Sequence, residues 1–139
     1  MPAFECVLPV RVTDFGPSMH MDNISFQEFV QESRNAFLLD RGLVPGAEGA
    51  QLMLVRTMAL DYAAPVPFGV TELTMTVEAT HIGRTSFTLR HRMRIDDDVV
   101  FTAEVVLIAS NSEDRSEEIS PRFRAELESI LTEETEEAS

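Results

Sequence analysis

The chain contains no lysine and a single cysteine among its 139 residues, and all eleven cations are arginine. Aspartate and glutamate number 24, which gives a formal net charge of −13. Nucleic acids and anionic membranes bind proteins through clustered positive charge, so this balance argues against both as partners. Cys6 cannot form an internal disulfide, which is typical of proteins from a reducing compartment.

Long hydrophobic runs are also missing. The longest, at residues 105–109, is far shorter than the ~20 residues that a membrane-spanning helix needs. No basic segment followed by an apolar segment opens the sequence, so we expect no secretory signal and a cytoplasmic location. The length favours one domain, at residues 1–131, and the EETEE sequence predicts a disordered acidic tail at 132–139.

Helical periodicity predicts one long helix over about residues 24–41. Ser25 and Glu28 have the spacing of a capping box at its start, and Gly42 stands where a left-handed C-terminal cap is expected. The buried face of this helix is expected to hold Phe26, Phe29, Val30, Ser33 and Phe37.

Alternating apolar residues predict five strands. They are expected at residues 3–13, 52–62, 70–79, 86–95 and 99–109, with a hairpin turn at 96–98 and a short helix from Pro121 to about Leu131. In the second strand, residues 52, 54, 56, 58, 60 and 62 are expected to share one face. A helix with a broad aromatic face must bury it, and the sheet is the available surface. The sequence therefore predicts an α+β fold in which a five-stranded antiparallel sheet curls around one central helix.

Three stretches carry motifs. MHMDNISFQEFVQESRNAFLLDRGL at residues 19–43 is similar to a G-H-V-N-N loop followed by a Y-L-x-x-F-E-E-A-R helix. The matching positions are His20, Asn23, Phe26 in place of tyrosine, Glu32 and Arg34. RTMALDYAAPVPFGVTEL at 56–73 is similar to R-x-x-x-x-Y-x-x-P-x-x-x-G-D-x-L, and IGRTSF at 82–87 to a strand-turn signature. From about residue 10 to 127, the chain resembles the 4-hydroxybenzoyl-CoA-thioesterase-like branch of the hotdog-fold acyl-CoA thioesterases.

The resemblance implies an enzyme that hydrolyses an acyl-CoA to a carboxylic acid and coenzyme A, at an interface between subunits of a homodimer or homotetramer. Coenzyme A would be part of the substrate, and no resident cofactor or metal is expected. The catalytic residues expected are Asp14, His20, Asp22 and Asn23. The substrate-binding residues expected are Met19, Met21, Phe26, Arg84, Thr85 and Ser86, with Arg84 as the first choice for a phosphate contact.

The catalytic carboxylate is left open by the sequence. The family usually has an aspartate four residues before the loop histidine, where this chain has Gly16. Asp14 takes that place if the loop is two residues longer, and Asp22 is the second candidate, although it is also a natural helix N-cap. With neither, the chain would be a non-catalytic acyl-CoA-binding protein. An acyl-carrier-protein thioesterase is a further alternative, which the acidic surface disfavours because carrier proteins are acidic too.

The chemistry needs a stabilised carbonyl oxygen and an activated attacker. Free amides at a helix N-terminus bind a developing oxyanion, and the backbone of residues 19–23 is expected to supply them. A nearby carboxylate attacks the carbonyl or takes a proton from water. Outside this loop, His91 is expected to be a core histidine, and Arg90, Arg92 and Arg94 to form a solvated outer stripe balanced by glutamates.

Overall fold

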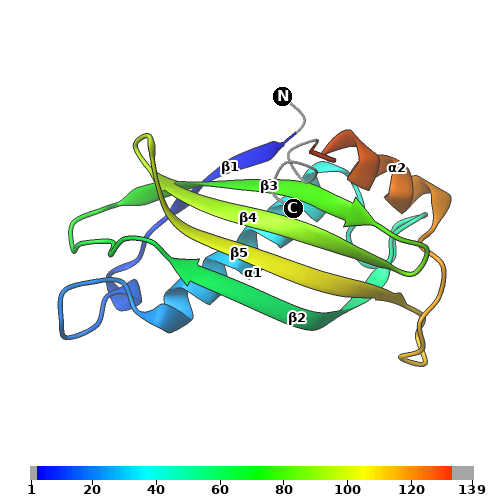
Figure 1. Ribbon diagram of the computed structural model, residues 1–139, viewed down its shortest axis with the longest axis horizontal. Coiled ribbons are helices and arrows are strands. Elements are labelled where there is room, and N and C mark those ends of the chain that lie inside the picture. Colours follow the sequence, from blue (N-terminus) through cyan, green and yellow to red (C-terminus); the bar gives the residue numbers. More distant parts are fainter. Residues whose placement is uncertain (1–2, 133–139) are drawn as a thin grey trace.

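The computed structural model describes residues 3–132. Five antiparallel strands form one sheet in the order β1-β3-β4-β5-β2, and two helices accompany it (Figure 1). The strands are β1 (Phe4–Pro9), β2 (Leu52–Tyr62), β3 (Glu72–Ile82), β4 (Ser86–Ile95) and β5 (Asp98–Ser110). The helices are α1 (Asn23–Asp40) and α2 (Pro121–Ser129), with a 3₁₀ turn at Val12–Asp14. This architecture confirms the predicted α+β class.

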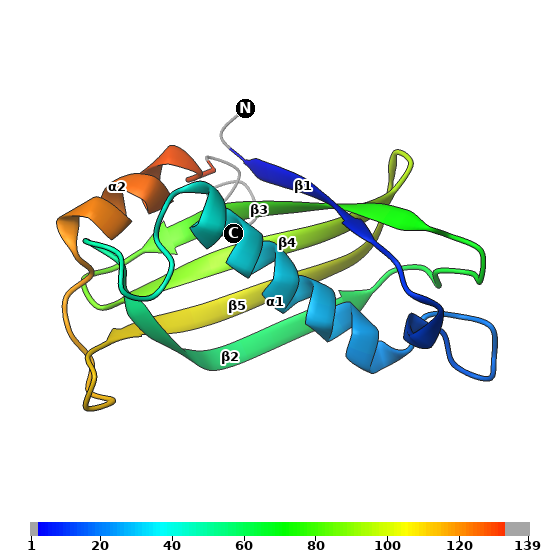
Figure 2. The same ribbon diagram turned by 180° about the vertical axis from the view of Figure 1, so that it is seen from behind.

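Helix α1 crosses one face of the sheet (Figure 2). The residues that it buries include all five expected from the helical spacing: Phe26, Phe29, Val30, Ser33 and Phe37. The helix bounds agree with the prediction to within one residue at each end. Gly42 follows with a φ of 69°, the left-handed conformation that was expected of it.

The predicted capping box at the start of α1 is wrong. The N-cap residue is Asp22, and Ser25 lies within the first turn of the helix. The Ser25 hydroxyl donates to Oδ1 of Asp14 at 3.0 Å, while the Glu28 carboxylate accepts from Nη2 of Arg11 at 2.9 Å. Asp14 and Arg11, which precede the helix, therefore bind the two side chains that were expected to form the capping box.

The first strand is shorter than predicted, because it ends at Pro9. The backbone N–H of Arg11 donates to Oδ2 of Asp14 at 2.7 Å, and this contact closes the Val12–Asp14 turn where a strand was expected. The start of α1 and the end of β1 are thereby joined through a single carboxylate.

Strand β2 contains a bulge between Val55 and Thr57, where its register against β5 shifts. The bulge interrupts the alternation, so the predicted single face of residues 52–62 is wrong. Met53, before the bulge, and Leu60, after it, are the residues that pack against the core. Because β2 is an edge strand and most of its side chains are exposed, it presents an apolar surface that includes Leu54 and Val55.

The core lies between α1 and the inner face of β3, β4 and β5, as the alternation in these strands predicted. On the opposite face, Arg90 of β4 pairs with Glu78 of β3, with Nη2 2.7 Å from Oε1. The expected balancing by a glutamate is therefore present, but both residues are buried rather than solvated.

The last described residues run beside β3. Helix α2 covers the core with Phe123 and Leu127, and the backbone N–H of the buried Thr132 then donates to the carbonyl of Ala79 at 2.9 Å. Residues 133–139, most of the predicted acidic tail, lie outside the described residues. Within residues 3–132, neither helix combines the length and apolarity needed to cross a bilayer.

Candidate active site at the start of helix α1

The loop that precedes α1 is held by its own backbone. The N–H of Gly16 donates to the carbonyl of His20 at 3.0 Å, and the N–H of Met19 donates to that of Gly16 at 2.9 Å. Phe68 and Met21 add bonds between this loop and residues 66–68. Met19 has a φ of 67°, a left-handed conformation that is uncommon for residues other than glycine and is often found at functional sites. The loop therefore has a defined shape in front of the helix.

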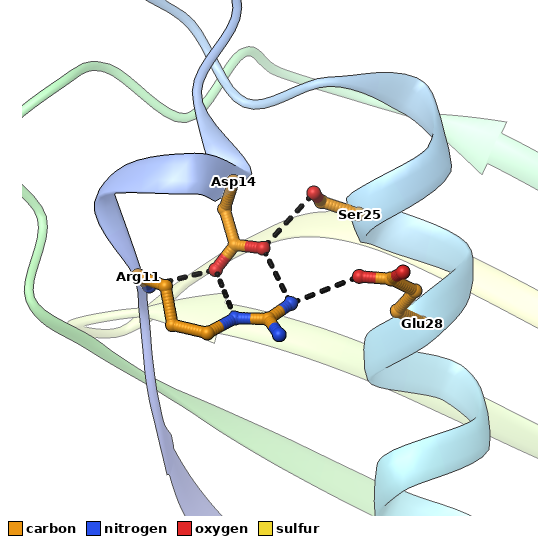
Figure 3. Close-up of polar contacts among 4 residues, drawn as sticks. All are labelled: Arg11, Asp14, Ser25 and Glu28. Carbon is orange, nitrogen blue, oxygen red and sulfur yellow. Dashed lines mark hydrogen bonds and ion pairs between the residues drawn. The ribbon is translucent and has the colours of Figure 1, made fainter.

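Asp14 lies behind this loop and is almost inaccessible, with 1% of its surface exposed. Both of its oxygens are occupied: Oδ1 accepts from Nη2 of Arg11 at 2.7 Å and from Ser25, and Oδ2 accepts from the N–H of Arg11 (Figure 3). Burial tends to raise the pKa of Asp14, but the hydrogen bonds from Arg11 and Ser25 outweigh it and lower this pKa. Asp14 is thus a buried anion that ties the loop to α1.

Asp22 has the opposite surroundings. It is exposed, and its side chain makes no capping hydrogen bond to the helix. Its carboxylate is folded back over Gly16: a β-carbon at residue 16 would collide with Oδ1 of Asp22 and lie 3.2 Å from its Cγ. The carboxylate therefore occupies the space that a side chain at residue 16 would fill, at the same end of α1 as the free amides.

The helix start provides fewer free amides than the sequence suggested. In the range 19–23, the N–H groups of Met19, Met21 and Asp22 already donate to backbone carbonyls. The N–H groups of Asn23, Ile24 and Ser25 have no acceptor within residues 3–132. Since α1 has 18 residues and no side-chain cap, these first-turn amides form an uncapped positive end.

The other predicted loop residues lie around this helix start. His20 is exposed, and its ring makes no hydrogen bond with residues 3–132. Asn23 is the exposed first residue of α1, and Met19 is 54% exposed. Met21 is buried in the core. His20 and Asn23 are therefore accessible from solvent, whereas Met21 serves packing.

Phe26 was predicted to bind substrate. Its ring lies in an aromatic cluster whose other members, Tyr62 and Phe101, were not assigned to the site. Its ring centroid is 5.1 Å from that of Tyr62 and 4.9 Å from that of Phe101. Phe26 and Phe101 are buried, but Tyr62, at the end of β2, is 40% exposed. Tyr62 thus forms the accessible part of an aromatic wall beside the helix start. The signal that pointed to it was the tyrosine of the motif in residues 56–73.

The predicted phosphate-binding residues are far from this place. Arg84 and Thr85 form the turn between β3 and β4, and Ser86 begins β4. The helix start lies near the Glu72 end of β3, where β1 ends, and the turn follows the Ile82 end. β3 has eleven residues, so its two ends lie ten residue rises, about 33 Å, apart. Figure 2 shows the start of α1 and the β3–β4 turn at opposite ends of the sheet. Arg84 itself pairs with Glu118 at 3.0 Å. Within one chain, the predicted phosphate-binding residues therefore do not lie near the start of α1.

The two remaining histidines are not part of this site. His91 is completely buried under α1, as was expected of a core histidine, although only its Nδ1 is hydrogen bonded. His81 is exposed near the β3–β4 turn. Among residues 3–132, no group of three or more His, Cys, Asp or Glu side chains is arranged to hold a metal ion.

Comparison with known proteins places this geometry in a family. The model of the thioesterase-like superfamily matches residues 10–127. No curated protein matches the chain significantly.

Solved structures share the fold at low sequence identity. The PA5185 protein from Pseudomonas aeruginosa is 19% identical with a TM-score of 0.83, covering 94% of this chain and 92% of that chain. A predicted thioesterase from Bacillus stearothermophilus is 22% identical with a TM-score of 0.81, covering 94% and 97%. A thioesterase from Thermus thermophilus, solved with coenzyme A and zinc, is 21% identical with a TM-score of 0.77, covering 93% of each chain.

The family match extends over nearly the same residues as the motifs found in the sequence, and it includes the loop, α1 and strands β2 to β5. The predicted enzyme class, a thioester hydrolase, is confirmed at the level of the family. The chain belongs to the thioesterase-like superfamily.

Proposed function

We propose that the protein hydrolyses an acyl-CoA thioester to a carboxylic acid and free coenzyme A at the start of α1. The observation that carries this proposal is the exposed carboxylate of Asp22, which has no hydrogen-bond partner within residues 3–132 and lies beside the uncapped end of an 18-residue helix. The reaction needs hydrogen-bond donors that stabilise the oxyanion of the intermediate, and a base that activates water. The coenzyme A complex of the Thermus thermophilus neighbour supports coenzyme A as part of the ligand.

In the proposed reaction, the thioester oxygen lies against the N–H groups of Asn23 and Ile24. Asp22 takes a proton from water as the water oxygen bonds to the carbonyl carbon. The amides stabilise the resulting oxyanion, and loss of one such donor commonly costs about 3–4 kcal/mol of barrier. The intermediate then collapses, the carbon–sulfur bond breaks, and the proton passes from Asp22 to the departing thiolate. His20 and Asn23 flank the carbonyl and position it.

Asp14 has a positioning role in this proposal. Its oxygens are filled by Arg11 and Ser25, so it has no lone pair directed toward a substrate. By fixing Ser25 in the first turn, it holds the helix start in front of the loop. Of the two carboxylates that the sequence offered, the geometry favours Asp22 as the base.

We also propose that the enzyme is a homodimer joined through β2. Within residues 3–132 no strand pairs with the outer edge of β2, and many of its exposed side chains are apolar, including Leu54 at 46% and Val55 at 47% exposure. Two such edges pair into one continuous sheet, with each half curled around its own α1 as in the hotdog fold. A twofold axis at β2 brings the β3–β4 turn of one copy to the same end as the helix start of the other. Arg84 then contacts the coenzyme A phosphates across the interface, with Thr85 and Ser86 beside it.

The test is a hydrolysis screen over short, branched, aromatic and long acyl-CoAs, with detection of the released thiol. We expect Asp22→Asn to reduce kcat by about 100-fold or more, the usual range for loss of a general base, without lowering Tm. Asp14→Asn is expected to lower Tm more than it lowers kcat. Asp97→Asn, in the exposed β4–β5 turn, is the matched control and should change neither. Undiminished turnover in Asp22→Asn would exclude Asp22 as the base.

A second candidate function is binding of acyl-CoA without hydrolysis, which the missing side chain at residue 16 favours. It predicts a rise in Tm with coenzyme A and no thiol release from any acyl-CoA in the screen. An acyl-carrier-protein thioesterase is separated from the main proposal by comparing rates on one acyl group attached to each carrier.

A further inference from the structure

A cavity of about 510 Å³ lies between the second half of α1, the loop that follows it and the first residues of β2. Its walls are largely apolar and include Leu38, Leu43, Leu52 and Met53. A volume of this size suits a small organic ligand. The cavity is separate from the candidate active site of its own chain, because Arg34 in its wall stands twelve residues along α1 from Asp22, about 18 Å.

Among the described residues 3–132, Arg34 is the only charged one in the cavity wall. It is half-buried, and within residues 3–132 its guanidinium has no carboxylate or other hydrogen-bond partner. Burial without a partner lowers the pKa of Arg34, as expected for a cation withdrawn from water. Its charge also opposes protonation of the nearby His91. An unpaired, partly desolvated guanidinium is unfavourable in free energy, so a bound anion would stabilise it.

The cavity contrasts with the rest of the protein. The chain has 24 acidic residues, yet none of those within residues 3–132 lines this cavity. The polar groups beside Arg34 are the amides of Gln31 and Asn35, which donate and accept hydrogen bonds. The Gln51 amide, also in the wall, is already occupied by Ser110 and Glu117. The wall thus combines one cation and two free amides with an apolar surface, the complement of a carboxylate on a hydrocarbon body.

We propose that this cavity binds a carboxylate attached to a hydrocarbon chain or ring, with Arg34 holding the carboxylate. Two sources provide this chemistry. One is a free carboxylic acid, the product class of the proposed reaction. The other is an acyl-CoA whose acyl group ends in a carboxylate, and this source rests on the proposed function and the proposed dimer.

In the proposed dimer, the acyl group of an acyl-CoA bound at the active site of one copy can reach the cavity of the other copy. Antiparallel pairing of two β2 strands sets the start of one beside the end of the other. The cavity lies at the start of β2, and Tyr62 at the end of β2 contacts Phe26 at the start of α1. The cavity of one copy therefore opens beside the candidate active site of the other, within reach of a short acyl group.

The first experiment measures binding by calorimetry, with octanoate as the carboxylate and octanamide as its neutral match. We expect octanoate to bind the purified protein, and Arg34→Met to weaken this binding about tenfold or more, because the variant loses the charge-assisted hydrogen bonds to the carboxylate. Arg94→Met is the matched control, because Arg94 is also half-buried and lies on the other face of the sheet. Arg34→Gln replaces Arg34→Met if the latter does not fold.

The proposal is overturned if octanoate does not bind, if octanamide binds as tightly, or if both Arg34 variants bind octanoate like the wild type. A second arm compares the hydrolysis of adipyl-CoA and hexanoyl-CoA. Preference for adipyl-CoA that is lost in Arg34→Met supports the acyl source, while equal rates together with octanoate binding support the free acid. Failure to hydrolyse any acyl-CoA would count against the proposed function alone, because the binding arm does not require turnover.

Discussion

Nδ1 of His91 and Oγ of Ser33 lie 2.8 Å apart, in a buried contact between the middle of β4 and the underside of α1. The Ser33 hydroxyl is also 2.9 Å from the carbonyl of Val30, one turn earlier in the helix. Nε2 of His91 is buried without a partner among the described residues. This contact therefore satisfies one of the two ring nitrogens.

Removal of the Ser33 hydroxyl should be more harmful than removal of the imidazole. We expect Ser33→Ala to lower the free energy of unfolding by about 1–3 kcal/mol, because it leaves both nitrogens of a buried ring without a partner. The double variant Ser33→Ala with His91→Leu should recover part of this loss, because it also removes the imidazole whose nitrogens would lack hydrogen-bond partners. Urea unfolding at pH 7.5 measures both, and a double variant less stable than Ser33→Ala would contradict this account.

Stability should fall in mild acid because of His91. Burial, aided by the charge of Arg34, lowers the pKa of His91 from 6.5 to about 3. As the pH falls from about 6.5 toward 3, the unfolded chain takes up a proton that the folded chain refuses, so folding is progressively disfavoured. Between pH 7.5 and pH 4.5 this single group should cost about 2–3 kcal/mol.

The measurement is urea unfolding at these two pH values in the wild type, His91→Leu and His81→Gln. His91→Leu should lose less stability on acidification than the wild type, whereas His81→Gln, which changes an exposed histidine, should behave like the wild type. The window lies above the ordinary pKa of aspartate, so the contribution of Asp14, whose pKa is lowered, is mostly retained in it. An equal loss of stability on acidification in all three proteins would contradict this prediction.

Gly16→Ala should act through Asp22. Gly16 is outside the positive-φ region, so alanine is compatible with its backbone, but the new β-carbon would meet the Asp22 carboxylate. We expect kcat/KM to fall toward that of Asp22→Asn, with little change in Tm. The double variant Gly16→Ala with Asp22→Asn should be no slower than Asp22→Asn alone, because the two changes disturb one group. Additive losses would show that Gly16 matters for another reason.

Leu54→Lys should weaken the proposed dimer. The substitution sets a charge on the exposed apolar edge strand, where two copies would bring like charges together. Light scattering after size-exclusion chromatography should give a dimer for the wild type and a larger monomer fraction for the variant. Val12→Lys, at a residue 76% exposed outside the sheet, is the control and should remain dimeric. A monomeric wild type would refute the interface directly.

The fold was predictable where periodicity alone decides it. The buried stripe of α1 and the alternation of β3, β4 and β5 follow from side-chain spacing, and the family motifs located the loop before α1. Errors arose where one side chain overrode a local pattern. Ser25 has the spacing of a cap, yet Asp14 takes its hydroxyl, and a bulge after Val55 reverses the faces of β2.

The sequence located the loop that forms the candidate site, but not the arrangement of its residues. Asp14 and Asp22 are equivalent in the sequence, and only tertiary contacts separate them: Arg11 and Ser25 enclose one, while the other lies free over Gly16. The distance of Arg84 from the helix start could not be read from the motif order either, because it depends on the direction of β3 in the sheet. Arg34 was visible only as a motif match until its cavity was known.

If Asp22 is the base that we propose, its fit over Gly16 means that the carboxylate of the site can be supplied from either of two positions in a chain. A sequence alignment sorts proteins by column, and a glycine in the column of the usual aspartate would mark this one as defective. Searches for hydrolases of this architecture are therefore better directed at the volume in front of the helix, whichever residue fills it.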